Sequence, residues 1–181
     1  GWLIAIVLFF AIVSNTAFAL GVPQYISRKI MHFGAAIPIA LSPVLFESVT
    51  WPLILAGMFF LLLVATHRWD VFPGFAKKGR WSELYFPLSV FVSLGLLWGL
   101  NPWAAIVPGL SLALGDGATG IVRNLIYKHE VKGWWGSVAC LAICSGLGFL
   151  VQPLWVGLLA GVAFTLAERY CGDAKGSLVK L

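Results

Sequence analysis

Long apolar runs separated by short polar stretches make up most of the chain. Seven apolar segments can be drawn, and they span residues 2–21, 31–46, 49–66, 84–100, 103–115, 134–151 and 153–167. A helix needs about 20 apolar residues to cross the hydrocarbon core of a bilayer, with about 17 at the lower limit. The second, fifth and seventh segments are shorter, so we expect them to be tilted, partly buried or extended by a neighbouring turn. The pattern predicts an all-α, polytopic membrane bundle of about seven transmembrane segments, with residues 1–181 in a single domain.

Basic residues occur only in alternate connections between these segments. They follow the first, third, fifth and seventh segments, whereas the connections Glu47-Ser48, Asn101-Pro102 and Gln152-Pro153 contain none. The twelve basic residues are Arg28, Lys29, Arg68, Lys77, Lys78, Arg80, Arg123, Lys128, Lys132, Arg169, Lys175 and Lys180. Cytoplasmic loops of membrane proteins carry an excess of Lys and Arg. The alternation predicts an integral membrane protein with its N-terminus outside, its C-terminus inside and its active face on the cytoplasmic side.

Composition supports a membrane bundle over other classes of protein. The chain is 60% apolar and 10% charged, whereas a soluble domain is about 45–50% apolar and about 25% charged. The net charge is +5, but no basic stripe lies on a polar scaffold, so we expect no nucleic-acid partner. Cys140 and Cys144 lie one helical turn apart in an apolar run. That setting favours small buried side chains over a metal site.

A carboxylate flanked by glycines ends the fifth segment. Asp116 lies between Gly115 and Gly117, and an apolar helical stripe follows at residues 121–126. Asp116 is therefore expected near the start of an amphipathic helix, where glycine lets a ligand approach the backbone and the helix N-terminus favours phosphate. A carboxylate repels phosphate unless a cation bridges them, so Asp116 fits a Mg²⁺ ligand. The alternative is that Asp116 only caps the helix.

Further along the same connection, Lys132, Gly136 and Ser137 can supply a charge and a hydroxyl to the same phosphates. The alternative for this stretch is a solvated basic loop.

The remaining candidates lie in the other basic connections. Arg28 and His32 share one helix face if a helix begins near Ser27, and Lys29 is also next to His32. An ionisable group in a membrane segment indicates function, although cations that reach toward lipid headgroups are the alternative.

Two carboxylates stand at the ends of apolar segments. Glu83 begins the fourth segment, and the nearest candidate partner for it is Arg80, three residues earlier. Glu168 ends the last segment beside Arg169, and a surface ion pair is the alternative to a functional role.

Taken together, these motifs resemble the membrane lipid kinases that include dolichol, phytol and farnesol kinases and the CTP-dependent diacylglycerol kinase. The order and spacing hold over residues 28–168. The elements that are similar are Arg28-Lys29-Ile30-Met31-His32, the run from Arg80 to Pro87, Gly115-Asp116-Gly117-Ala118-Thr119, the run from Lys132 to Ser137, and the late Glu168. The chain departs from the family at Arg123 and Tyr127, where glycines are usual, at Gly133, where serine is usual, and at Trp135, where many members have glutamate. The resemblance is therefore to a divergent member.

The resemblance implies that the γ-phosphoryl group of CTP, or of another nucleoside triphosphate, is transferred to a membrane lipid alcohol. An isoprenoid alcohol such as phytol or a polyprenol is the first expectation. In that case Asp116 and Glu168 would hold Mg²⁺, and His32 or Glu83 would orient or deprotonate the lipid hydroxyl. The nucleotide phosphates would be bound by Arg28, Lys29, Arg123, Lys132, Gly136 and Ser137.

Two other functions are compatible with the same sequence. One is a related cytidylyltransferase that forms a CDP-lipid and releases pyrophosphate. The other is a non-catalytic membrane subunit, in an oligomer or a larger complex.

The alternation of basic connections leads to a topological prediction. A cysteine introduced at Asn101 is expected to react with a membrane-impermeant maleimide only from the external side, because the connection that contains it lacks cations. Labelling of intact and inverted membrane vesicles measures this accessibility. Reaction from the cytoplasmic side would contradict the predicted orientation.

Overall fold

The computed structural model describes residues 2–69, 71–74, 81–127 and 133–171. In chain order its elements are α1 (Trp2–Ala19), α2 (Gln24–Leu45), α3 (Thr50–Trp69), the short 3-10 helix η1 (Trp81–Leu84), α4 (Tyr85–Leu97), α5 (Pro102–Leu110), the π-helical turn η2 (Ser111–Gly115), α6 (Asp116–Tyr127), α7 (Trp134–Gly148) and α8 (Leu154–Cys171). The described part of the chain contains no strand, which confirms the predicted all-α class.

Each of the seven predicted apolar segments contains a helix, but several boundaries differ from the prediction. Helix α2 begins at Gln24, seven residues before the predicted segment, so Arg28, Lys29 and His32 lie inside it. Elements α5, η2 and α6 follow one another without a break from Pro102 to Tyr127. The fifth apolar segment therefore continues as a helix into what we predicted to be a connection, and Asp116 lies within a long helical rod.

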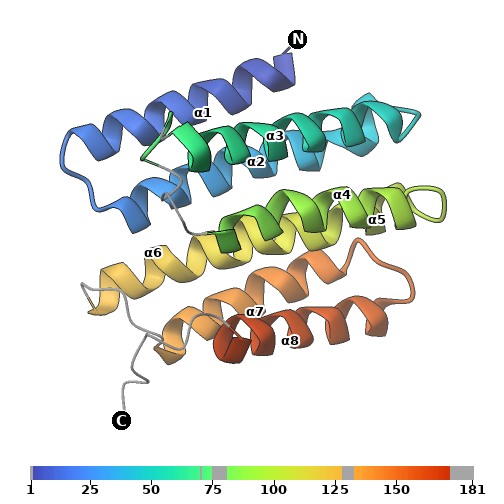
Figure 1. The fold of residues 1–181 in the computed structure, drawn as a ribbon. Coiled ribbons are helices and arrows are strands. Elements are labelled where there is room, and N and C mark those ends of the chain that lie inside the picture. The colour runs from blue at the N-terminus through green and yellow to red at the C-terminus, as the bar shows by residue number, and fades with distance from the viewer. Residues whose placement is uncertain (1, 70, 75–80, 128–132, 172–181) are drawn as a thin grey trace.

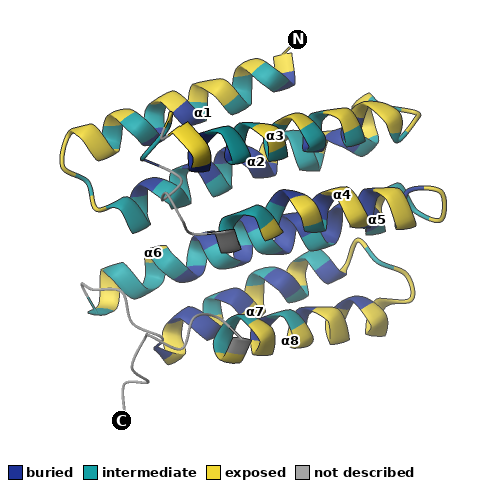
Figure 2. Cartoon of the chain, viewed as in Figure 1, coloured by how far each residue is buried: buried dark blue, intermediate teal, exposed yellow. Residues whose placement is uncertain are grey.

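In the part of the chain that the structure describes, three helical stretches are long and apolar enough to cross a membrane, namely Trp2–Ala19, Thr50–Trp69 and Pro102–Tyr127. Helices α4 and α7 are apolar but shorter. Large apolar side chains such as Phe9, Leu96 and Leu159 are exposed, and exposed positions cover much of the outer surface of α1 and α8 (Figure 2). Helices that are apolar on all faces are typical of membrane spans, so the structure supports a helical membrane protein.

The helices lie side by side along one common direction (Figure 1). The α2–α3, α4–α5 and α7–α8 connections lie at one end of the bundle, together with the N-terminus. The α1–α2 turn and the C-terminal ends of α6 and α8 lie at the other end. The connections without basic residues are thus gathered at one end, which is the arrangement that the alternation of charges requires.

A buried core lies where α2, α3, α4 and α5 meet. It contains Ala36, Ala56, Val90, Leu94, Trp98, Ala105, Ile106, Leu110 and Ala113. The alanines among them let the helix backbones come close, as small residues do at helix interfaces within membranes.

Helices α7 and α8 come closest at a pair of glycines. A Cβ atom on Gly157 would lie 2.2 Å from the carbonyl oxygen of Gly148, and one on Gly148 would lie 2.7 Å from the carbonyl carbon of Gly157. Both clashes are with backbone atoms, which cannot rotate away. The two positions therefore need glycine for the helices to pack.

This contact predicts that Gly157→Ala destabilises the protein by roughly 1–3 kcal/mol, the usual range for overpacking. Thermal unfolding of the detergent-purified variant measures the effect, and the midpoint is expected to fall. Gly146→Ala is the matched control, because nothing lies within 4 Å of a Cβ atom there. Equal midpoints for the two variants would show that the close approach is not a constraint.

Candidate functional site

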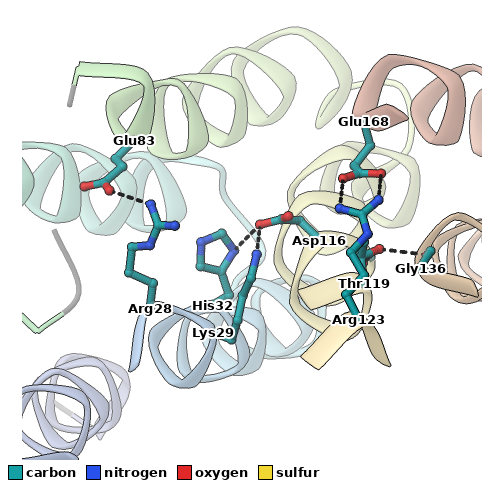
Figure 3. A network of polar contacts seen from close by, with 10 residues as sticks. Arg28, Lys29, His32, Glu83, Asp116, Thr119, Arg123, Gly136 and Glu168 are labelled. Atoms are coloured by element: carbon teal, nitrogen blue, oxygen red, sulfur yellow. Dashed lines mark hydrogen bonds and ion pairs between the residues drawn. The ribbon is translucent and has the colours of Figure 1, made fainter. Parts of the chain in front are cut away.

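A series of ion pairs crosses the bundle near the ends of α2, α6 and α8, and we call it the polar row (Figure 3). It consists of Arg28, Lys29 and His32 on α2, Glu83 on η1, Asp116 and Arg123 on α6, and Glu168 on α8. Every pair in it joins residues that are far apart in sequence. The polar row therefore links elements that the sequence alone does not place together.

Asp116 is at the centre of the polar row. Its Oδ2 atom accepts a hydrogen bond of 2.6 Å from the Lys29 ammonium group and lies 3.6 Å from Nδ1 of His32. Lys29 and His32 are three residues apart on α2, so they extend from the same helix face. The Asp116 side chain is 32% exposed, against 12% for Lys29. The carboxylate is thus the member of this group that a ligand can reach most easily.

A π-helical turn directly before Asp116 sets the direction of this carboxylate. Such turns contain an extra residue and often occur at functional sites. The turn packs against α7 through Gly115, where a Cβ atom would lie 2.9 Å from the sulfur of Cys144. One turn later the Thr119 hydroxyl lies 2.7 Å from the carbonyl oxygen of Gly115 and 3.1 Å from that of Gly136, so it can donate to either. These contacts attach the start of α6 to α7.

Glu83 lies at one end of the polar row. Its Oε1 accepts a 2.9 Å hydrogen bond from Arg28, and its Oε2 lies 3.8 Å from Nε2 of His67 on α3. His67 is buried, and its Nδ1 lies 2.9 Å from the carbonyl oxygen of Leu63. We predicted Arg80 as the partner of Glu83, but Arg80 lies outside the described residues. The structure thus adds Arg28, 55 residues earlier in the chain, as a partner of Glu83.

Glu168 lies at the other end of the polar row and is held by Arg123. The two guanidinium nitrogens of Arg123 donate to the two carboxylate oxygens at 3.1 and 3.2 Å. Both side chains are nearly buried, at 12% and 11% exposure. Gly136 makes room for this arginine, because a Cβ atom there would lie 2.4 Å from Nε of Arg123. A larger residue at position 136 would therefore displace the Arg123 side chain.

Ser137 and Arg169 form a further contact beside this pair. Arg169 donates to the Ser137 hydroxyl at 3.2 Å, and its guanidinium carbon lies 3.8 Å from the ring centroid of Trp134. That distance is within the range of a cation–π interaction. From the sequence, Arg169 was expected only as a surface partner of Glu168 and Thr119 only as part of the Gly115–Thr119 element, and His67 was not singled out. His67 was detectable, because it is an ionisable group at the end of an apolar segment, as His32 is.

The predicted metal ligands, Asp116 and Glu168, point to different partners. Asp116 faces Lys29 and His32, whereas Glu168 faces Arg123 (Figure 3). Among the described residues, no group of three or more His, Cys, Asp or Glu side chains comes together. Mg²⁺ in nucleotide sites is usually held by one or two carboxylates, with phosphate and water completing its shell. The Oδ1 atom of Asp116 accepts no bond from a described residue, so Asp116 fits this chemistry, whereas Glu168 uses both its oxygens on Arg123.

The other predicted nucleotide-binding residues are distributed along the polar row. Arg28 and Lys29 are on α2, Arg123 is on α6, and Gly136 and Ser137 are in the first turn of α7. Lys132, also predicted to bind phosphate, lies outside the described residues.

No family model matches the chain, and no curated protein and no solved structure matches it either. The chemistry of the polar row is therefore the basis for a proposed function.

Proposed function

We propose that this protein transfers the γ-phosphoryl group of a nucleoside triphosphate, with CTP as the first candidate, to the hydroxyl of a membrane lipid alcohol. The observation that carries the proposal is the group formed by Asp116, Lys29 and His32. A cation and an imidazole lie within 4 Å of a partly exposed carboxylate, near one end of an apolar bundle. An isoprenoid alcohol is the preferred acceptor on the sequence resemblance alone.

The group has the components that phosphoryl transfer requires. This reaction depends on positioning and on neutralising the charge of the phosphates more than on covalent chemistry. Asp116 would hold Mg²⁺ through Oδ1, and the ion would neutralise part of the charge on the phosphates. Lys29 is already directed at the same carboxylate, so its ammonium group is in place to pair with an equatorial phosphate oxygen.

His32 is the better candidate for the base. In the reaction the lipid oxygen forms a bond to the γ-phosphorus, the bond from that phosphorus to the β-phosphate oxygen breaks, and the hydroxyl proton must be accepted. His32 lies 3.6 Å from Asp116, whose negative charge stabilises an imidazolium. Glu83, the other candidate, is paired with Arg28. We therefore propose that His32 accepts the hydroxyl proton. Glu83 would instead position Arg28.

Arg123 and Ser137 would contribute to phosphate binding only after a change of partner. In the structure Arg123 is engaged by Glu168, and the Ser137 hydroxyl accepts from Arg169. A triphosphate carries enough negative charge to compete for both arginines. Arg28 and Lys29 would then bind from α2, and Arg123 from α6.

The proposed membrane orientation follows the basic connections. We place the polar row at the cytoplasmic end of seven spans, with the N-terminus outside and the C-terminus inside. Arg28 and Lys29 lie in the first two turns of α2, next to the α1–α2 turn. That turn is at the end of the bundle opposite to the three connections without basic residues (Figure 1). The nucleotide would then arrive from the cytoplasm and the lipid alcohol from the inner leaflet.

The decisive test is transfer of label to lipid by the detergent-purified protein. Nucleoside triphosphates labelled at the γ position, or at the α position, are incubated with Mg²⁺ and a panel of lipid alcohols and lipid phosphates. Label from the γ position in the lipid supports a kinase. Label from the α position in the product of a lipid phosphate would instead identify a cytidylyltransferase, and no labelled lipid with any combination would favour a non-catalytic subunit.

Asp116→Asn is expected to lower γ-phosphoryl transfer by about 10²–10³-fold, the range for removing one group that stabilises charge in the transition state. The amide oxygen can still accept a hydrogen bond from Lys29, but the charge that neutralises Lys29 is lost. The thermal midpoint should therefore fall, and the rates of variant and wild type are compared at a temperature below both midpoints. Glu47→Gln is the matched control, because it makes the same carboxylate-to-amide change at an exposed position at the other end of the bundle. If Asp116→Asn kept most of the wild-type rate, the kinase assignment would have to be abandoned.

A further inference from the structure

An apolar cavity of about 530 Å³ lies between α1, α2, α3 and α4. Twenty residues line it, and Ser42 is the one polar side chain among them. The Ser42 hydroxyl already donates to the carbonyl oxygen of Ile39 at 2.8 Å. A ligand in this cavity would therefore find no free polar group along the walls, which selects for a hydrocarbon.

The cavity is elongated along the helix axes. On α3 its lining extends from Pro52 to Ala65, a rise of about 20 Å at 1.5 Å per residue. Along α4 it extends from Phe86 to Leu94. The volume is within the usual range of about 300–1,000 Å³ for sites that enclose one small ligand. The shape fits one extended chain rather than a compact head group.

The inner end of the cavity adjoins the polar row. Phe86 lines the cavity and lies against His32, with ring centroids 5.5 Å apart. Phe59, also in the lining, packs edge-on against Phe86, with ring centroids 6.1 Å apart. One aromatic ring thus separates the apolar space from the imidazole that contacts Asp116.

The cavity also has a rim on the outer surface of the bundle. Leu8 on α1 and Met58 and Leu61 on α3 belong to the lining, yet their side chains are 43%, 48% and 66% exposed. In a bilayer this surface faces lipid chains, not water, so a hydrocarbon can enter sideways without crossing a polar layer.

We infer that this cavity binds the single hydrocarbon chain of the lipid alcohol, with its hydroxyl end at Phe86 and His32 and its tail toward Pro52 and Leu94. The inference deepens the proposed function and rests on it for the identity of the head group. It also adds a restriction, because a lipid with two chains would have to leave one of them outside the cavity.

A photolabelling experiment tests the position of the chain without relying on catalysis. Two long-chain primary alcohols are used, one with a diazirine next to the hydroxyl and one with a diazirine near the terminal methyl. Peptides from α3 are identified by mass spectrometry after irradiation of the full-length protein in nanodiscs. The first probe is expected to label residues 62–65 and the second residues 52–55. Labelling that does not follow the position of the diazirine would overturn the inference.

Competition distinguishes a substrate chain from an ordinary membrane chain. Unlabelled long-chain alcohol should reduce labelling, whereas added phosphatidylcholine should not. Equal competition by both would show that a bilayer lipid fills the cavity and would overturn the inference. Position-dependent labelling supports the site even if no γ-label reaches a lipid, and in that case only the proposed kinase activity fails.

Two variants narrow the cavity in different ways. Ala56→Leu adds bulk to the buried wall, and Met58→Trp adds bulk at the exposed rim, where folding is least at risk. Each is expected to lower labelling by the tail probe about tenfold, which corresponds to about 1.4 kcal/mol of binding. Ala160→Leu is the control, because it adds the same bulk at an exposed position on α8, outside the lining. Unchanged labelling in a folded Met58→Trp variant would contradict the inference.

Discussion

A charged side chain among apolar helices costs free energy unless an opposite charge neutralises it. In this protein that requirement is met across the bundle, since Lys29 on α2 pairs with Asp116 on α6, and Arg123 pairs with Glu168 on α8. Apolar surfaces alone discriminate weakly between neighbours in a membrane, because lipid tails are as apolar as the helices. The ion pairs therefore help to decide which helices are neighbours. Removing one partner from a buried pair costs about 3–5 kcal/mol, so the same contacts hold the bundle and form the candidate site.

Much of the architecture could be predicted because the apolar runs report directly on helices. Each predicted segment contains a helix, and the connections alternate between two ends as the basic residues suggested. The ends of the helices were harder to predict from the sequence. Hydropathy falls where α2 carries Arg28 and Lys29, yet the backbone remains helical from Gln24, because paired cations are compatible with a helix. Likewise, glycines around Asp116 suggested the end of a segment, whereas the helical rod continues through them to Tyr127.

The candidate site was predictable as a set of residues but not as a set of contacts. The sequence singled out Arg28, His32, Glu83 and Asp116 because ionisable groups are rare in apolar segments. It gave no reason to pair Arg28 with Glu83, since 55 residues separate them and the pairing depends on how the helices pack. The π-helical turn before Asp116 has no sequence signal of its own. The match between Arg123 and Gly136 also becomes visible only when α6 and α7 are in contact.

The burial of the Asp116 group is uneven, and this matters for the direction from which ligands can approach. Lys29 is nearly buried, whereas Asp116 presents about a third of its side chain to the outside. His32 lies between Asp116 and Phe86, and so contacts both the charged group and the wall of the apolar cavity. Asp116 is thus the most exposed part of this group, whereas Phe86 adjoins the apolar cavity. In the proposed reaction, the charged ligand and the hydrocarbon would meet at His32. Nδ1 of His32 is buried, although 26% of the side chain is exposed. A buried group interacts more strongly with a neighbouring charge than a solvated group does. Under the proposed function, this difference in exposure would direct the phosphates to the carboxylate and the hydrocarbon chain to the Phe86 side of the imidazole.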